Sequence, residues 1–304
     1  MDNILLKTES LQQYWLDCRG TLESYYNELA NLNFESAKQV AEKLGALVND
    51  YEKSGTNNRP DEFYNDCFIF DRFASLLNCY AQYWSQICAG SYPGSWDTLQ
   101  DVLDSLRLLK RFSHFDRTSL FKFLERQAQA LEKLYPYKVF SSIEAVVSRV
   151  DCSICGRNME SLECEHIAGE LYRGKLAYGI VKEIKNLLSV SLVENPADKR
   201  CKMMAINNKS IPFTGVEYLK DLVFVKKCNP LRISRTEEST RRIKIAEDTG
   251  ADEDCPCGSG KKLKECCFGK DFFERRHVEI IISEHMRLSL DNFVCLSQDS
   301  LDGE

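Results

Sequence analysis

The sequence predicts an α+β protein in which an N-terminal helical bundle precedes a β-rich region that is stabilised by metal. Apolar residues of the first half recur at helical spacing, with few prolines between them. In the second half, runs rich in β-branched residues alternate with Gly and Pro, and cysteines gather in two compact clusters. We therefore expect a helical domain at 1–150, a knuckle and β-rich domain at 151–250, and a metal module with C-terminal strands at 251–304.

The composition is that of an ordinary globular protein. With 304 residues, of which 43% are hydrophobic and 28% charged, the chain can bury a core in more than one domain. No apolar run approaches the roughly 18 residues of a membrane span. The first residues also lack the basic start of a signal peptide, so a cytoplasmic location is expected. Seven of the 14 cysteines lie outside the two clusters and are expected to be reduced, buried thiols.

The net charge of -6 is unevenly distributed. Residues 171–245 contain 16 lysines and arginines against 7 acidic residues, whereas both flanking regions are acidic. Two interpretations of this basic region stay open. Its charges either solvate the face of a sheet or form a patch that binds an anion or a nucleic acid.

Five or six helices are expected between residues 9 and 149. The first apolar stripe steps by four and three residues, as one face of an amphipathic helix does: Leu11, Trp15, Cys18, Leu22, Tyr25 and Leu29. A second stripe has the same spacing: Ala37, Val40, Leu44, Leu47 and Tyr51. Further helices are predicted at 61–88, 96–112 and 118–135, between loops rich in Gly, Ser, Asn and Pro. His114 falls in such a loop without a ligand-type neighbour, so a structural role is expected.

The first cysteine cluster follows the helices directly. Its ligand-type residues have the spacing C-x2-C-x8-C-x-H: Cys152, Cys155, Cys164 and His166. Gly156 allows the left-handed turn of a zinc knuckle, and four ligands without a spare position indicate a closed structural zinc site. The alternative is that Cys152 and Cys164 are core thiols and His166 is a surface residue, which leaves Cys155 unexplained.

The β-rich region after this cluster is predicted from β-branched and aromatic runs. Residues 187–193 and 201–206, with a turn at 194–198, are expected to form a hairpin. Further strands are expected at 222–225, 243–246, 278–282 and 293–296. Residues 233–242 have few apolar side chains and are expected to be an exposed loop. The acidic residues of 250–254 are expected to be a solvated linker to the second cluster.

The second cluster has four cysteines at C-x-C-x8-C-C spacing within thirteen residues: Cys255, Cys257, Cys266 and Cys267. Four thiolates suit a tetrahedral zinc at about 2.3 Å, and Gly258 and Gly260 permit the tight turn between the pairs. A loop with so few apolar residues is expected to obtain its fold from the metal. Two zinc ions per chain are therefore predicted.

The run Cys-Pro-Cys-Gly-Ser-Gly-Lys-Lys-Leu-Lys-Glu-Cys-Cys at 255–267 resembles the SEC-C motif, the zinc-binding tail of the protein-translocation ATPase SecA. The resemblance implies that the four cysteines bind zinc and that the module is a small docking surface for a protein partner. Lys261, Lys262 and Lys264 are expected to project around the metal as a basic, partner-binding surface. The motif usually ends its chain, whereas 37 residues follow here, from Phe268 to Glu304.

A second segment, at about 150–200, is similar to a zinc-knuckle segment of phage head-maturation protease-like proteins. It combines the first cluster with the run Ser189–Val193 and Pro196-Ala197. The strand that carries the nucleophilic serine of that family has no counterpart here. The resemblance therefore implies a β-rich fold and a bacterial mobile-element or phage-defence setting, not proteolysis.

These observations favour a zinc-binding, non-enzymatic interaction or adaptor protein that docks a protein partner through its SEC-C-like module. The first alternative is a nucleic-acid-binding protein that uses residues 171–245 and the lysines of the module. The second is a zinc-dependent or protease-like enzyme. Both clusters offer four ligands, which leaves no position for a catalytic water, and no phosphate loop, H-E-x-x-H or G-x-S-x-G motif occurs. No membrane partner is expected.

Overall fold

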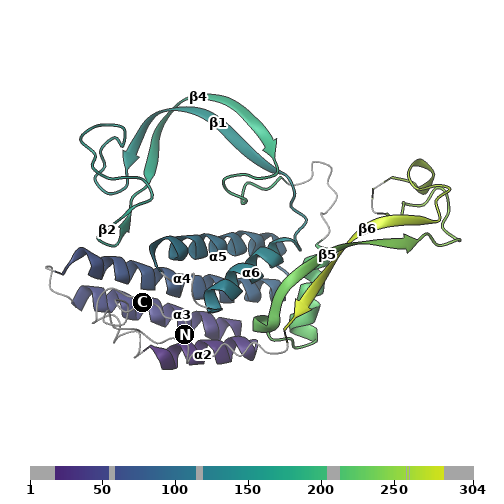
Figure 1. Ribbon diagram of the computed structural model, residues 1–304, viewed down its shortest axis with the longest axis horizontal. Helices are drawn as coiled ribbons and strands as arrows, with labels where there is room; N and C mark the ends of the chain where they lie inside the picture. The colour runs from purple at the N-terminus through teal and green to yellow at the C-terminus, as the bar shows by residue number, and fades with distance from the viewer. Residues whose placement is uncertain are drawn as a thin grey trace, which may run out of the picture.

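The computed structural model describes residues 18–54, 59–113, 119–203, 213–257, 259 and 261–283. Their first part is a bundle of five long helices, shown in Figure 1. These are α2 (Arg19–Ala30), α3 (Phe34–Ser54), α4 (Asp61–Ala89), α5 (Tyr92–Phe112) and α6 (Ser119–Glu132). The α+β fold class and the N-terminal helical bundle are therefore confirmed. The division at residues 150 and 250 stays a prediction.

The apolar stripes of the bundle agree with helical spacing. In α2 the buried positions are Leu22, Tyr25 and Leu29, as predicted. Helix α3 differs in detail, since its buried stripe is Ala37, Ala41, Leu44 and Val48, and Leu47 is 42% exposed. Spacings of three and four residues fit two adjacent stripes, and packing against α4 selects one of them. Residues 11 and 15 of the first stripe and His114 lie outside the described residues.

Helix α4 is the centre of the bundle, because it packs against both α3 and α5. Its aromatic residues are buried on several faces: Phe63, Phe70, Phe73, Tyr80, Tyr83 and Trp84. A helix that is apolar around most of its circumference must be surrounded by other helices. Gly90 ends α4 in the left-handed conformation with φ 77°, which a residue without a Cβ adopts without strain.

The helix predicted at 118–135 agrees with α6, but the helical region does not extend to about residue 149 as expected. Strand β1 (Phe140–Cys152) begins well before that point and pairs antiparallel with β4 (Gly179–Val193). The predicted strand at 187–193 is confirmed within β4, but its partner is β1 and not 201–206. Only Lys202 forms a bridge, to Phe140, and residues 204–206 lie outside the described part of the chain. The apolar residues of β1 are compatible with the spacing of either a helix or a strand. The segment is a strand because β4 supplies an antiparallel partner.

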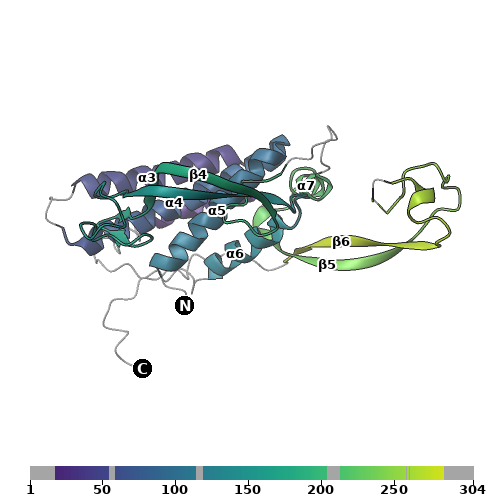
Figure 2. The same ribbon diagram turned by 90° about the horizontal axis from the view of Figure 1, so that it is seen from above.

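The β1–β4 ribbon forms an arch over the helical bundle (Figures 1 and 2). Its pairing contains four register shifts, three of which leave an extra residue in β4. Bulges of this kind bend a ribbon and increase its twist, which accounts for the curvature. Beyond the arch lie the first cysteine cluster and a small hairpin of β2 (Leu171–Tyr172) and β3 (Lys175–Leu176).

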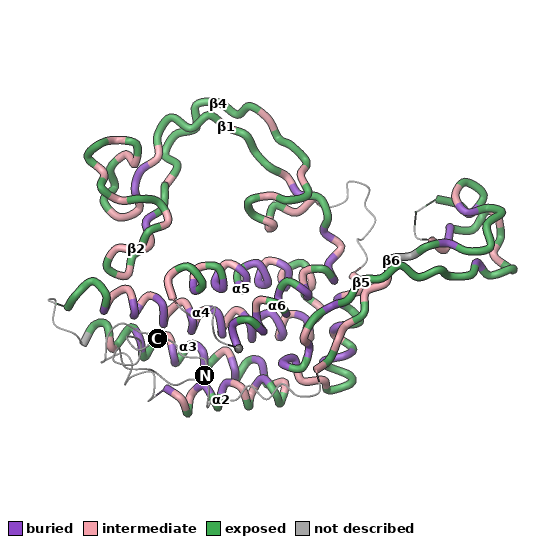
Figure 3. The backbone as a smooth tube through the Cα atoms, viewed as in Figure 1, coloured by how far each residue is buried: buried purple, intermediate pink, exposed green. Residues whose placement is uncertain are grey.

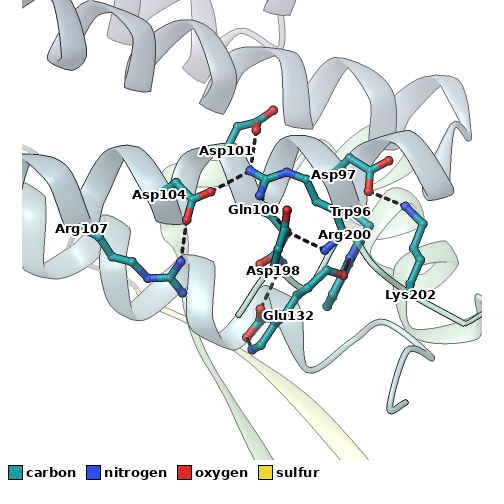
Figure 4. Close-up of polar contacts among 11 residues, drawn as sticks. Trp96, Asp97, Gln100, Asp101, Asp104, Arg107, Glu132, Asp198, Arg200 and Lys202 are labelled. Atoms are coloured by element: carbon teal, nitrogen blue, oxygen red, sulfur yellow. Dashed lines mark hydrogen bonds and ion pairs between the residues drawn. The ribbon is translucent and has the colours of Figure 1, made fainter. Parts of the chain in front are cut away.

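The foot of the arch is held on α5 and α6 by a polar network, shown in Figure 4. Arg200 contacts Asp101 at 2.6 Å and Asp104 at 2.8 Å on α5, and Asp198 at 3.0 Å in its own turn. Lys199 pairs with Glu132 of α6 at 2.7 Å, and Lys202 pairs with Asp97 of α5. Several cations of the basic region therefore neutralise acidic residues of the helical bundle.

After the arch, a short helical segment completes the bundle core. It consists of α7 (Thr214–Lys220), a helical turn at Asp221–Val225 and a further turn at Pro230–Arg232. The strand predicted at 222–225 is therefore wrong. Leu222 and Val223 are buried in the same core as the long helices, so their apolar character serves helix packing and not a sheet.

A second ribbon, the arm, consists of β5 (Ile233–Lys244) paired antiparallel with β6 (Phe272–Ile282). The exposed loop predicted at 233–242 is wrong, whereas the strand at 278–282 is confirmed; 293–296 lies outside the described residues. Charged side chains are compatible with a strand here because the distal arm is exposed to solvent, as the colouring of Figure 3 shows. The base of the arm is buried, where Ile233 and Thr236 pack against the bundle and Thr236 Oγ1 donates to the Ala130 carbonyl at 3.3 Å. At the far end, Phe273 of β6 is buried as well. Among the described helices, none has both the length and the apolar character that crossing a bilayer requires.

Candidate metal centres

The first cluster lies at the far end of the arch, and its backbone forms a knuckle. Cys152 is buried at the end of β1, and its amide donates to the Arg157 carbonyl at 2.7 Å. The Gly156 amide donates to the Cys152 carbonyl at 2.9 Å, and Gly156 has φ 71°. The turn therefore returns the chain over Cys152 and brings Cys155 beside it, as the sequence predicted.

The four side chains of this cluster are brought together. The ligand atoms of Cys152, Cys155, Cys164 and His166 all lie within 4.8 Å of one another. The sulfurs of Cys155 and Cys164 are 3.7 Å apart. A thiolate tetrahedron around zinc at about 2.3 Å has edges of roughly 3.8 Å, so the spacing fits a metal of this size.

Two further contacts fit metal binding at this site. The amide of Ile154 lies 3.4 Å from the Cys152 sulfur, and the backbone amide of Cys155 lowers the pKa of the Cys152 thiol. The buried Nδ1 atom of His166 has no hydrogen-bond partner. A buried imidazole nitrogen without a partner is unfavourable in a metal-free protein, whereas coordination to a metal would satisfy it. The alternative of two core thiols and a surface histidine is therefore unsupported.

The knuckle end of the arch is attached to α4 and α5. The Gly174 amide donates to Asn65 Oδ1 at 2.9 Å, and Arg173 pairs with Asp61 at 3.3 Å. Arg111 of α5 pairs with Glu170 at 2.7 Å. A Cβ atom at position 174 would lie 2.7 Å from the Tyr64 carbonyl oxygen, so only glycine allows this approach. The arch is thus fixed to the bundle at both of its ends.

The second cluster lies at the far end of the arm (Figures 1 and 2). The ligand atoms of Cys255, Cys257, Cys266 and Cys267 also lie within 4.8 Å of one another. The sulfurs of Cys257 and Cys266 are 3.5 Å apart, and those of Cys266 and Cys267 are 3.7 Å apart. A short 3-10 turn, Leu263–Glu265, directs the second cysteine pair back toward the first. Gly258 and Gly260, to which the turn was attributed, lie outside the described residues.

The module around this cluster has its own small core. Besides the cysteines, this core contains Ile245, Leu263 and Phe273, and it is separate from the core of the bundle. Three apolar side chains are too few to fold a domain, and a metal held by the four cysteines would supply the stabilisation that this core lacks. Hydrogen bonds from Ser259 lower the pKa of Cys257 to about 6, which favours the thiolate that a metal requires.

The three predicted partner-binding lysines do not form a uniformly basic surface, because two of them form ion pairs. Lys262 pairs with Asp254 at 2.7 Å, and Lys264 pairs with Asp252 at 2.5 Å. The acidic residues before the cluster are therefore partners of the lysines, whereas the sequence indicated only a solvated linker. Nearby, Phe268 is 66% exposed. The surface of the module combines charges of both signs with an aromatic side chain.

Both centres offer four ligand atoms to a metal, which is the number that a closed tetrahedral site requires. A structural role is the chemistry that such closed sets perform. Sequence reasoning missed the polar network around Arg200 at the foot of the arch, which we call the clamp. It also missed the arm that carries the second module. The acidic positions Asp97, Asp101 and Asp104 of α5, spaced by four and three residues on one helix face, are the signal that points to such a clamp.

Comparison with known proteins finds a match to a short segment of the chain. Residues 253–269 match the model of the SEC-C motif. The match coincides with the second cluster and bears out the resemblance that the sequence suggested. No curated protein matches the chain. No solved structure matches it either.

Proposed function

We propose that this protein is a zinc-binding, non-enzymatic interaction protein that docks a protein partner through its SEC-C module and holds one zinc at each cluster. Thiolate and imidazole ligands in closed sets of four favour zinc over magnesium or calcium, which prefer oxygen ligands. The SEC-C motif is a zinc-binding motif, which supports the same metal at the second cluster.

The position of the module carries the proposal. It lies at the end of the arm, distant from the helical bundle, with a core that it does not share with the bundle. Because the module adds no side chains to the core of the bundle, its position at the end of the arm does not stabilise the bundle. Presentation to a partner explains this placement better than a structural role does.

The chemistry of the module surface supports a protein partner. An exposed Phe268 beside Lys261, Lys262 and Lys264 combines an aromatic anchor with a polar rim, which is the usual composition of a protein interface. The ion pairs of Lys262 and Lys264 with aspartates reduce the positive potential that a polyanion would require.

Nucleic-acid binding through residues 171–245 is the alternative. The cations Arg173, Lys199, Arg200 and Lys202 of this region pair with acidic residues of the helical bundle, which supports the structural interpretation of its basic composition. Other cations, such as Lys182 and Lys185 on the arch, form no ion pair with a described residue and keep the alternative testable. A zinc-dependent or protease-like activity has no support from the closed ligand sets. A cytoplasmic accessory role in a bacterial mobile-element or phage-defence system is the setting that the sequence resemblances suggest.

The test is an affinity capture with the zinc-loaded full chain from extract of its native cells. Phe268→Ala and the combined Lys261→Gln, Lys262→Gln and Lys264→Gln variants should keep both zinc ions and lose the captured protein. Lys185→Gln on the arch is the matched control and should retain it. Capture that disappears with nuclease and falls steeply with salt would favour the nucleic-acid alternative. Capture unchanged in both module variants would refute docking through the module.

A further inference from the structure

One face of the arch carries a row of aliphatic cross-strand pairs, whereas the other face is polar near the foot. Residues directly opposite in an antiparallel pair share a face, and successive residues alternate between faces. Ile143 is opposite Val190, Ala145 is opposite Leu187, and Val147 is opposite Ile184, so three consecutive cross-strand pairs of one face are aliphatic. The other face is polar where Ser142 is opposite Ser191 and where Glu144 accepts a hydrogen bond from Ser189 at 3.0 Å.

The apolar face is exposed to solvent. Ile143 is 68% exposed, Val190 62% and Ile184 61%. Together with three neighbours these side chains form what we call the aliphatic stripe: Ile143, Val147, Ile184, Leu187, Val190 and Leu192. Isolated exposed apolar residues are normal, but a contiguous exposed set marks an interaction site. A two-stranded ribbon is also only marginally stable without a covered face.

At the foot of the arch the stripe points away from the helical bundle. Phe140 is buried and stacks on Trp96 of α5 with ring centroids 6.2 Å apart, and the opposite residue Val193 packs on the same core. Ile143 is three positions after Phe140, in a part of β1 without a register shift, so it lies on the opposite face. The helices therefore leave this part of the stripe uncovered and accessible from outside.

We propose that the aliphatic stripe is the interface of a homodimer, in which the apolar faces of two arches pack against each other about a two-fold axis. The stripe contains only aliphatic residues of similar size along its length, so reversing its direction still places aliphatic on aliphatic. Such self-complementarity is what a two-fold interface requires. The absence of aromatic and charged residues from the stripe is typical of core-like homodimer interfaces and unlike the anchors of transient complexes.

The area and the edges of the arch support the same occupant. Five of the six side chains are more than half exposed and Val147 is 38% exposed. At on the order of 100 Å² for each of the five and about half of that for Val147, the stripe offers roughly 550 Å², against about 800 Å² per partner in a stable interface. The register shifts and the charged residues Lys182 and Lys185 on β4 disfavour pairing of the arch edges with another strand. The face, and not the edge, is therefore the surface for a second copy.

The test is the mass of the zinc-loaded full chain in solution, measured by sedimentation velocity and light scattering over a wide concentration range. The wild type should be a dimer that dissociates on dilution. The double variant Ile143→Lys with Val190→Glu keeps an opposite-charge cross-strand pair but interrupts the stripe, so it should be a folded monomer. Ser142→Lys with Ser191→Glu introduces the same pair on the polar face and should remain a dimer.

Each outcome decides the proposal. A wild type that stays a monomer at the highest concentration would overturn it, whatever other molecule covers the stripe. A dimer that survives in the Ile143 and Val190 variant would place the interface elsewhere. Loss of the dimer in both double variants would assign the effect to damage of the ribbon and would equally refute a face-specific interface. Circular dichroism and zinc content verify that each variant is folded.

Discussion

The indole Nε1 of Trp96 donates a hydrogen bond to the carbonyl oxygen of Lys199 at 2.8 Å. Trp96 lies on α5 and is buried, whereas Lys199 lies in the turn that follows the arch. The Trp96 ring thus packs against Phe140 at the start of β1 and is hydrogen-bonded to the backbone just after the end of β4. This residue joins the two chain segments of the foot.

Trp96→Phe should therefore loosen the foot of the arch. The smaller ring keeps much of the packing, but the Lys199 carbonyl loses its partly buried donor. A lost hydrogen bond of this kind lowers the free energy of unfolding by about 1 kcal/mol. Chemical denaturation followed by circular dichroism measures the change, and hydrogen exchange should localise it to β1 and β4. Faster exchange throughout the bundle would contradict a local role for this bond.

The carboxylates around Arg200 give a second prediction. Arg200 contacts three of them and its side chain is 29% exposed. Partial burial acts to lower the pKa of its guanidinium, but the three carboxylates together outweigh this and raise that pKa. Arg200→Met should lower the free energy of unfolding by about 1 kcal/mol, because Asp101, Asp104 and Asp198 then repel one another. The loss should shrink in high salt, which screens that repulsion.

Arg107→Met is the matched control for this prediction. Arg107 also pairs with Asp104, but within the same helix and with a side chain that is 62% exposed. Its replacement should change stability much less. An equal loss in the two variants would mean that the clamp contributes no more than an ordinary surface pair.

Gly174 gives a third prediction, on the other end of the arch. Gly174→Ala adds a Cβ atom 2.7 Å from the Tyr64 carbonyl oxygen, at a residue with φ 73°. Both the contact and the left-handed backbone oppose the substitution, so the β2–β3 hairpin should detach from α4. We expect a loss of more than about 1 kcal/mol and new protease sensitivity at 166–178. Gly20→Ala, where no atom lies within 4 Å of the added Cβ, is the control and should be neutral or stabilising.

Metal content gives a fourth prediction. Purified protein should contain close to two zinc ions per chain, and Cys155→Ser and Cys266→Ser should each remove one. Cys201→Ser should remove none, because this exposed cysteine belongs to neither cluster. Elemental analysis with protein quantification measures the ratio. A wild-type ratio near one would eliminate the Cys152 cluster as a zinc site.

The two zinc variants should also differ in what they unfold. Cys155→Ser should reduce amide protection in the arch and at its contacts with α4, whereas Cys266→Ser should unfold only the module at the end of the arm. The bundle core contains neither cluster, so the long helices should keep their protection in both variants. Global unfolding by either substitution would show that the metal supports the bundle itself.

Local signals in the sequence predicted the helices and the metal clusters, because both depend on residues close together in the chain. The stripe of Leu22, Tyr25 and Leu29 and the spacing of the eight ligands need only one helix or one turn to be meaningful. The arch could not be predicted in this way. Pairing of Phe140 with Val193 depends on a distant partner, and the apolar residues between them are not in a core.

The arm also could not be predicted from local signals, because β5 lacks apolar residues at regular spacing. Residues such as Arg235 and Glu237 have no apolar periodicity, yet they belong to β5 because β6 supplies the hydrogen bonds. Ribbons that project into solvent need no buried face along most of their length. The pattern by which strands are usually recognised is therefore absent from them.

The arch and the arm are both two-stranded antiparallel ribbons, but they differ in where they contact the helical bundle. The arch contacts the bundle at its foot and at its knuckle, so both of its ends are held. Among the described residues, the arm contacts the bundle at its base, through residues such as Ile233, Thr236 and Glu238, and its other end projects away from the bundle. A ribbon that is attached at both ends has smaller thermal displacements than a ribbon of similar length that is attached at one end. We therefore expect the module on the arm to move over a wider range than the arch, which would help it to reach the protein partner that we propose.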